Sequence, residues 1–124
     1  MDVTPLIKDG ALIIQSYSDG KIRINGEQHN TPLLVLPDRV EDWLIKNDFQ
    51  KMEEGDFTPL INIANEIDVM LLGCGKEIKF LPPALKKTLR TKNLHIETMD
   101  TGAACRTYNV LLAEGRRVVV GFLI

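Results

Sequence analysis

The stretch LHIETMDTGAACRTYNVLLAEGRRVVVGFLI, residues 94–124, carries the pattern that decides the fold. LHIET alternates apolar and polar side chains as a half-buried β-strand does, and RVVVGFLI at 117–124 is a second strand. Between them, Thr101 is suited to cap a helix and Gly115 is suited to end it. The apolar face of that helix would carry Ala104, Tyr108, Leu111 and Leu112. Strand, helix and strand in this order predict two parallel strands joined by a right-handed crossover.

The same alternation extends toward the N-terminus. VMLLG at 69–73 is typical of a buried strand. Pro82 and Pro83 are suited to open a helix that turns Leu85 and Leu89 inward, because a proline is tolerated in the first turn of a helix.

Two further helices are expected before residue 69. Thr58 as N-cap and Pro59 at the first helical position predict one of them. Its buried side would carry Leu60, Ile63, Ala64 and Ile67. Asp38 and Glu41 resemble a capping box and predict a short helix that ends near Asn47. The apolar face of this short helix would carry Val40, Trp43 and Leu44.

The first thirty residues predict an antiparallel β-meander. ALIIQSY and KIRI flank the turn Ser18-Asp19-Gly20, and Asn25-Gly26 repeats the turn signal. Asp-Gly and Asn-Gly favour two-residue hairpin turns because these residues tolerate positive φ angles. PLLVLP at 32–37 follows as a short apolar run, which is typical of a strand buried on both faces.

These elements predict a single α/β domain over residues 1–124. Residues 1–30 would form the meander, and residues 31–124 would form a βαβ-type core. In that core a mixed, mainly parallel central sheet carries helices on both faces, which gives three layers. A chain of 124 residues that is 44% hydrophobic is long enough for one compact core and too short for two.

The charge pattern narrows the function classes. A net charge of −2 does not indicate a general nucleic-acid binder, and the chain carries no recognisable nucleic-acid module. Residues 38–68 carry nine acids and three bases, whereas residues 76–92 carry six bases and one acid. We expect an acidic side and a basic side, which are either solvated helix faces or a docking surface for an acidic partner.

Location and cofactor content can also be predicted. The apolar runs are far shorter than the roughly 20 residues of a membrane helix. The N-terminus does not resemble a secretory leader, so we expect a cytoplasmic protein that does not span a membrane. Two isolated cysteines and two histidines make no recognisable zinc pattern, so we expect reduced thiols, no metal and no cofactor.

Two loops of unusual composition follow strands that should end at the same edge of the sheet, where such folds hold their ligands. One loop follows the strand at 69–73, and the other follows the strand at 94–98. We predict that these loops and the start of the next helix form a pocket. The candidate pocket residues are Gly73, Cys74, Gly75, Lys76, Asp100, Thr101, Gly102, Cys105, Arg106 and Tyr108.

The pocket has two interpretations that the sequence leaves open. Free N–H groups at the helix start, together with Arg106 and Lys76, could hold a phosphate or a carboxylate. Alternatively, Asp100 or Thr101 satisfies those N–H groups, while Arg106 and Tyr108 tie the helix to its neighbours. The glycines at 73 and 75 fit either a phosphate loop or a tight strand exit.

Cys105 also has two interpretations. In the first turn of a helix and beside Arg106, a thiolate would be stabilised and could act as a nucleophile. His29 falls in the meander and His95 within a strand, so neither has an evident place as its base. A small buried cysteine is the alternative, and we assign no catalytic residue.

Three parts of the chain together resemble a known family of small uncharacterised domains. They are LLGCGKEIKFLPP at 71–83, ETMDTGAACRTYNVLLAEGRRV at 97–118, and the earlier Trp43. The most specific motif begins with Glu97-x-Met99-Asp100-Thr101, continues from Ala103 to Asn109 and ends with Glu114-Gly115-Arg116. The family includes mitochondrial NADH dehydrogenase (complex I) assembly factor 3, the adipogenesis-associated domain-containing protein, and many bacterial and archaeal single-domain proteins.

The resemblance implies a three-layer α/β fold with a mixed central sheet. It also implies a non-catalytic binding or assembly module with a protein partner, since the mitochondrial member helps to assemble complex I without an established reaction. The alternative is a small-molecule enzyme or ligand-binding protein with an anion pocket at Gly73–Lys76 and Asp100–Arg106. Relatives often have threonine at the position of Cys74, which argues against a required thiol there. The partner, the ligand and the oligomeric state are left open.

Overall fold

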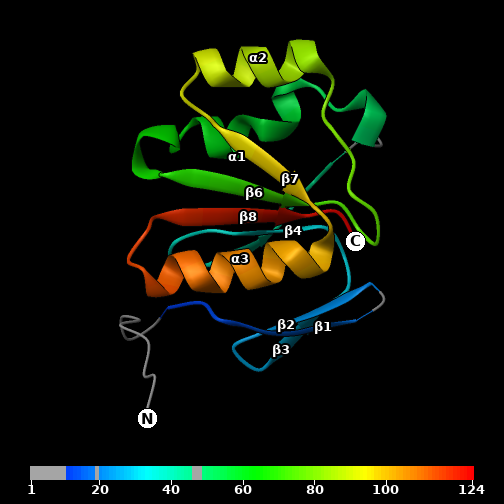
Figure 1. Ribbon diagram of the computed structural model, residues 1–124, viewed down its shortest axis with the longest axis vertical. Helices are drawn as coiled ribbons and strands as arrows, with labels where there is room; N and C mark the ends of the chain where they lie inside the picture. Colours follow the sequence, from blue (N-terminus) through cyan, green and yellow to red (C-terminus); the bar gives the residue numbers. More distant parts are fainter. Residues whose placement is uncertain (1–10, 19, 46–48) are drawn as a thin grey trace.

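A computed structural model describes residues 11–18, 20–45 and 49–124, which form two β-sheets and several helices (Figure 1). One sheet has the strand order β1-β2-β3, and the other has the order β5-β4-β8-β6-β7. The strands are β1 (Ile14–Ser18), β2 (Lys21–Ile24), β3 (Glu27–His29), β4 (Leu33–Val35), β5 (Val40–Asp42), β6 (Val69–Gly73), β7 (Ile96–Met99) and β8 (Val118–Phe122). The helices are α1 (Thr58–Ile61), α2 (Pro83–Thr91) and α3 (Thr101–Ala113), with 3₁₀ turns η1 (Phe49–Lys51), η2 (Glu54–Phe57) and η3 (Ala64–Glu66).

The three-stranded sheet is the predicted meander. All of its pairings are antiparallel, and positive φ angles of 68° at Gly20, 46° at Asn25 and 88° at Gly26 shape its two turns. These are the angles that short hairpin turns require. Asp19 of the predicted first turn, and residues 1–10 of the predicted meander, lie outside the described residues.

The five-stranded sheet is mixed, but parallel pairs do not dominate it. β6 pairs in parallel with β7 and β8, whereas β4 pairs antiparallel with β5 and β8. The prediction of a mainly parallel sheet is therefore wrong for β4 and β5. The cause is a tight turn after β4, where the Leu36 N–H donates to the Arg39 carbonyl at 2.8 Å. The chain reverses there into an antiparallel neighbour instead of crossing over through a helix.

The short helix predicted from Asp38 is wrong, because the strand β5 occupies its place. The Asp38 and Glu41 carboxylates were expected to cap a helix. They instead accept hydrogen bonds from the Arg39 guanidinium at 2.8 Å and 2.6 Å. The predicted end of this helix near Asn47 lies outside the part of the chain that the structure describes.

The helix predicted from Thr58 is divided into α1 and η3, and η2 directly precedes it. The Glu53 N–H donates to the Asp56 carboxylate at 2.9 Å, so the capping box lies there and Thr58 is not the N-cap. The Ile63 N–H donates to the Leu60 carbonyl, which is the tighter bonding pattern of a 3₁₀ turn. Leu60 is buried as predicted.

The other predicted elements are confirmed. β6 occupies the predicted residues, and α2 begins at Pro83 and buries Leu89. α3 ends at Ala113, and Gly115, with a φ of 77°, follows its C-cap as predicted. The Arg116 N–H then donates to the Leu111 carbonyl at 3.0 Å, as in a glycine-terminated helix.

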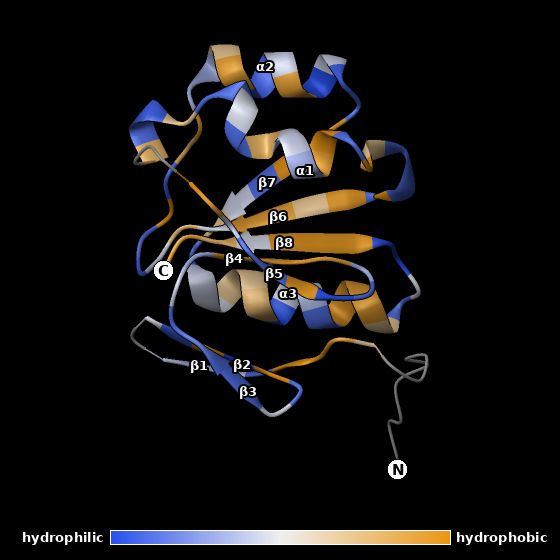
Figure 2. Cartoon of the chain, turned by 180° about the vertical axis from the view of Figure 1, so that it is seen from behind, coloured by the Kyte–Doolittle hydropathy of each residue, from blue (hydrophilic) through white to orange (hydrophobic). Residues whose placement is uncertain are grey.

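Buried apolar residues form one cluster on each face of the five-stranded sheet. Figure 2 shows the hydrophobic character of its central strand β8. Because successive side chains of a strand point to opposite faces, Met70 and Leu72 join one cluster and Leu71 joins the other. The first cluster includes Leu60 of α1 and Leu89 of α2, and the second includes α3 and the inner side of β1 and β2. The predicted arrangement of helices on both faces is confirmed, and α3 lies between the two sheets (Figure 1).

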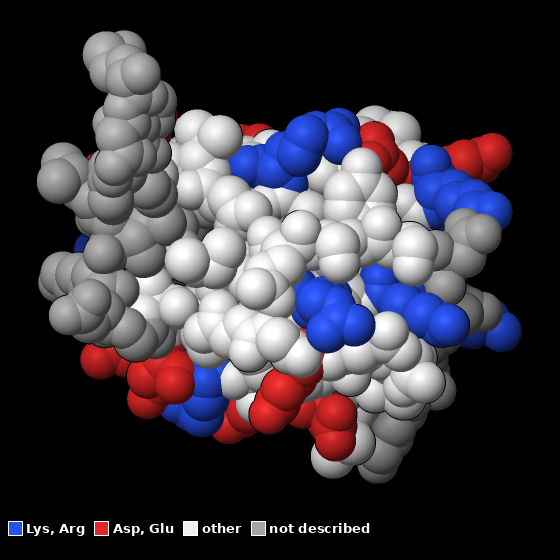
Figure 3. All heavy atoms as spheres, turned by 90° about the horizontal axis from the view of Figure 1, so that it is seen from below, with Lys and Arg blue, Asp and Glu red and all other residues white. Residues whose placement is uncertain are grey.

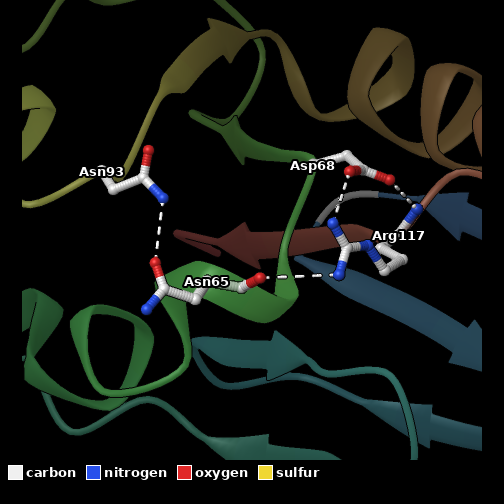
Figure 4. Close-up of polar contacts among 4 residues, drawn as sticks. All are labelled: Asn65, Asp68, Asn93 and Arg117. Carbon is white, nitrogen blue, oxygen red and sulfur yellow. Dashed lines mark hydrogen bonds and ion pairs between the residues drawn. The ribbon is translucent and has the colours of Figure 1, made fainter.

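A polar cluster aligns the starts of β6, β7 and β8 (Figure 4). The Arg117 guanidinium donates to the Asp68 carboxylate at 2.9 Å, and the Arg117 backbone N–H donates to the other carboxylate oxygen at 2.8 Å. These hydrogen bonds lower the pKa of Asp68 to about 2. Asn93 donates to the Asn65 carboxamide at 3.1 Å. The cluster therefore occupies the edge of the sheet opposite the predicted pocket.

Trp43 joins β5 to the helical layer. It is 4% exposed, its indole N–H donates to the Asp56 carbonyl at 2.8 Å, and its ring meets Phe57 edge to face at 5.6 Å. A Cβ at Gly121 would lie 2.5 Å from the Trp43 ring, so β8 needs glycine there to admit the indole. Leu44 is 85% exposed and does not share a face with Trp43, as the predicted helix required.

We expect Trp43→Ala to lower the free energy of unfolding by about 3–5 kcal/mol, because it leaves a cavity and removes the donor to Asp56. Urea unfolding followed by circular dichroism measures the loss. Leu44→Ala is the control, and its effect should stay within about 0.5 kcal/mol. Equal midpoints for the two variants would contradict the packing role of Trp43.

Candidate functional site

A pocket of about 670 Å³ lies where β6, β7 and β8 end, as predicted for the two unusual loops. Of the candidate residues, Gly75, Lys76, Asp100, Thr101 and Gly102 line it. The other described residues that line it are Tyr17, Ser18, Gly20, Leu123 and Ile124. Sequence reasoning missed all of these, because nothing local to them signals that the first hairpin and the chain end meet beside α3.

Hydrogen bonds join the two loops directly. The Thr101 N–H donates to the Gly75 carbonyl at 2.8 Å, and the Gly75 N–H donates to the Thr101 hydroxyl at 2.9 Å. The Cys74 N–H donates to the Met99 carbonyl at 2.8 Å. The start of α3 thus faces the loop after β6, as expected.

Asp100, and not Thr101, caps α3. The Asp100 carboxylate accepts a hydrogen bond from the Ala103 N–H at 2.8 Å, while the Thr101 hydroxyl is used by the neighbouring loop. The expectation that Thr101 caps this helix is therefore wrong. The carboxylate also places a negative charge at the positive end of the helix dipole, which is where an anionic ligand would gain most.

Cys105 is a buried neutral thiol. It lies in the second turn of α3 instead of the predicted first turn, and it is 3% exposed. Burial raises its pKa to about 12, and the opposing effect of the positive charge of Arg106 is smaller. Cys74 is also buried, and burial raises its pKa. The nucleophile interpretation of Cys105 is contradicted, because the reactive species is the thiolate.

The other polar side chains of α3 hold the meander. Arg106 donates to the Tyr17 hydroxyl at 2.9 Å, and the Tyr108 hydroxyl donates to the Leu12 carbonyl at 2.8 Å. Burial raises the pKa of Tyr108 to about 12, so its hydroxyl remains a donor. A Cβ at Gly102 would lie 2.5 Å from the Tyr17 hydroxyl, so a glycine at this position lets the hairpin approach the helix start.

The structure does not bring all ten candidate residues into one cavity. Gly73 is buried, and an added Cβ there would lie 2.7 Å from the Phe122 ring. Cys74 lines a separate hollow of about 280 Å³. Cys105, Arg106 and Tyr108 do not line the larger pocket. The pocket itself remains a prediction as a functional site.

The acidic segment 38–68 and the basic segment 76–92 meet at one point, where Lys92 and Glu54 form an ion pair at 3.1 Å. Figure 3, viewed from the side of the three-stranded sheet, shows charges of both signs with uncharged surface between them. That face therefore lacks the single-sign field of a nucleic-acid interface. Within the described ranges, no cluster of three or more His, Cys, Asp or Glu residues could hold a metal ion.

We expect the Cys105 thiol to resist alkylation in the folded chain at neutral pH. The sequence has two cysteines, so the variant Cys74→Thr retains the Cys105 thiol alone. A rise in pKa from 9 to about 12 lowers the thiolate fraction, and with it the iodoacetamide rate, by about a thousandfold. The urea-unfolded variant is the control. A folded-state rate equal to the unfolded one would contradict the burial of this thiol.

Residues 14–123 match a family described as protein of unknown function DUF498/DUF598. An uncharacterised protein of Rhodobacter capsulatus is 35% identical over 114 residues, which are 92% of this chain and 86% of that protein. NADH dehydrogenase (ubiquinone) 1 alpha subcomplex assembly factor 3 of Bos taurus is 30% identical over 106 residues, 86% of this chain. The chain spans only 57% of the length of that assembly factor. The predicted family resemblance is confirmed.

Solved structures share the fold. A Bordetella parapertussis protein is 31% identical with a TM-score of 0.81, covering 92% of this chain and 96% of that one. A Bartonella henselae protein, itself described as an outer membrane protein, is 32% identical with a TM-score of 0.79, covering 92% and 95%. A Bordetella pertussis protein described as a Mth938-like domain is 26% identical with a TM-score of 0.74, covering 99% and 92%. In the described part of this chain, no helix has the length and apolarity to cross a membrane.

Proposed function

We propose that this chain, which belongs to the DUF498/DUF598 family of proteins of unknown function, is a non-catalytic module that binds a protein partner. The observation that carries the proposal is that the fold already uses the reactive side chains around the pocket. Asp100 caps α3, Thr101 holds the adjacent loop, and Arg106 holds the meander. Cys105 is buried as a neutral thiol. A surface that binds a protein needs none of these groups to be free.

The relatives support the same function. The Bos taurus relative is named as an assembly factor of NADH dehydrogenase, and its similarity covers 86% of this chain. An assembly factor acts by binding other proteins. Exposed apolar side chains such as Phe80, 71% exposed, and Ile78, 51% exposed, provide surface for such contacts.

Native purification tests this function. The tagged chain, isolated from its own cells without denaturant, is expected to elute with another protein at a fixed stoichiometry. Light scattering and native mass spectrometry measure that stoichiometry. Arg106→Ala removes the hydrogen bond to Tyr17 at the pocket rim and should leave the complex intact. A chain that elutes free of other proteins while retaining a small molecule would contradict the proposal.

A second candidate function is the binding of a small phosphate or carboxylate in the pocket. Lys76 lines the cavity, and Arg106 donates to Tyr17 at its rim. Both cations could contact an anion. The Asp100 carboxylate at the start of α3 opposes this function, because it already accepts the Ala103 N–H and is itself negative.

A nuclear magnetic resonance titration decides between the two candidates. If the pocket binds anions, millimolar phosphate or acetate should shift the amide resonances of residues 73–76 and 100–106, and Arg106→Ala should abolish the shifts. Lys87→Ala, which removes a cation of α2 outside this pocket, should leave them unchanged. A wild-type chain without such shifts would exclude the anion pocket and leave the protein-binding function.

A further inference from the structure

β7 is an open edge of the five-stranded sheet, because among the described strands it pairs with β6 alone. The carbonyls of His95 and Met99 accept N–H groups from the β6 side at 3.2 Å and 2.8 Å. The backbone groups of successive residues in a strand point alternately to its two sides. Ile96 and Thr98 therefore turn their N–H and C=O groups outward, away from β6, and no described strand lies on that side to bond these groups.

A groove of about 390 Å³ follows this open edge. Its floor is formed by residues 94–98, and Lys86 and Arg90 of α2 form one wall. Phe80, from the loop before α2, also lines the groove and is 71% exposed. Unpaired backbone groups, an exposed aromatic ring and two cations therefore lie side by side.

The wall formed by α2 is electrostatically unbalanced. Lys92 of the adjacent turn is neutralised by Glu54, whereas Lys86 and Arg90 have no ion-pair partner among the described residues. Glu97 is the one acid among the described residues that line the groove. Since side chains alternate along a strand, Glu97 points away from the face that Ile96 shares with α2. The α2 side of the groove therefore favours acidic side chains in its occupant.

We propose that the β7 edge binds an extended segment of the partner protein, which adds to the sheet as a further strand and carries acidic side chains on the side of α2. This inference rests on the proposed protein-binding function and assigns its surface. The outward groups of Ile96 and Thr98 supply the main-chain hydrogen bonds of strand addition. Lys86 and Arg90 select acidic side chains at alternate positions, and Phe80 packs against an apolar one.

A second copy of this chain fits the edge less well. Pairing two β7 strands about a two-fold axis at Glu97 would place the two Glu97 side chains directly opposite each other, which is destabilising. The same axis would bring the Lys86 and Arg90 walls of both copies to one face of the joined sheet, where their charges repel. An acidic segment from another protein removes the repulsion between basic walls on the α2 side, and it need not place a glutamate opposite Glu97.

Proline variants test the backbone part of the proposal. Thr98→Pro removes an outward N–H, and edge strands tolerate proline at such positions. Asp42→Pro is the matched control on β5, the other edge of the sheet. The Arg39 carbonyl and the Trp43 N–H both form hydrogen bonds on the β4 side. Because backbone groups alternate between the two sides of a strand, the N–H of Asp42 points away from β4, toward the open side.

Charge variants test the wall of the groove without touching the strand. The double variant Lys86→Glu with Arg90→Glu reverses the two cations that line it. Lys87→Glu makes the same change on the same helix, at a residue that lies outside the groove lining. These side chains are exposed, so the fold should be retained in all of these variants.

The probe is an alternating Glu-Val octapeptide with blocked ends, compared with its Lys-Val counterpart by nuclear magnetic resonance titration. The Glu-Val peptide should shift the amide resonances of residues 94–98 and Phe80, and the Lys-Val peptide should bind about tenfold more weakly or worse. Thr98→Pro and the double charge variant should each weaken Glu-Val binding by about tenfold or more. Asp42→Pro and Lys87→Glu should bind as the wild type does.

Several results would overturn the proposal. They are shifts at β5 instead of β7, equal binding of the two peptides, no shift with either, and unchanged binding by Thr98→Pro. A dimer in light scattering that Thr98→Pro abolishes would make a second copy the occupant. If the native complex survives both groove variants, the β7 surface is wrong while the protein-binding function stands. If the wild-type chain forms no complex, the function itself is wrong.

Discussion

The Asn109 carboxamide holds the two sheets of this molecule in one arrangement. Its oxygen accepts the Ile14 N–H at 3.2 Å, and its nitrogen donates to the Ile14 carbonyl at 2.8 Å, so α3 holds β1 as a neighbouring strand would. A three-stranded meander has too little apolar surface to be very stable alone. Docked on α3, it buries Ile22 and Ile24 in a shared core. It also carries Tyr17 to the pocket rim. The meander and the pocket rim are therefore held by α3, through Asn109 together with Arg106, Tyr108 and the shared core.

The protonation state of the Cys105 thiol in α3 depends more on burial than on the helix dipole. A helix N-terminus stabilises a negative charge by about 0.3–1 kcal/mol at an exposed site. The rise of the Cys105 pKa from 9 to about 12 corresponds to about 4 kcal/mol in the opposite direction. Burial therefore prevails, and the thiol stays neutral. A stretch dense in reactive residue types thus becomes a set of structural contacts once Ala104 and Tyr108 turn into the core.

Much of the fold follows from local signals, and the failures share one cause. Asn25-Gly26, Pro83 and Gly115 act through their own backbone preferences, so the sequence predicts their turns and helix ends correctly. Asp38 and Glu41 have the spacing of a capping box, but pairing with β4 and an ion pair to Arg39 give a strand. For the pocket, the loops after β6 and β7 could be predicted, because parallel strands end at one edge. Tyr17 could not, because its place is fixed by contacts with α3 some ninety residues away in sequence.

The two edges of the five-stranded sheet differ in how they meet solvent. β5 is three residues long, follows directly from β4 through a tight turn, and has Arg39 paired with the acids on either side of it. Short edge strands with charged side chains discourage strand addition. β7 instead lies beside a groove whose cations have no ion-pair partner among the described residues. Edge strands in proteins are usually protected against pairing with other chains. The open edge of β7, beside Phe80 and the basic wall of α2, therefore fits a strand that binds a partner. The groove and the pocket share no described lining residue, but Thr98 of the groove and Asp100 of the pocket are two residues apart in the chain. The C-terminal end of β7 therefore joins the two sites, and a strand added at this edge would end beside the pocket.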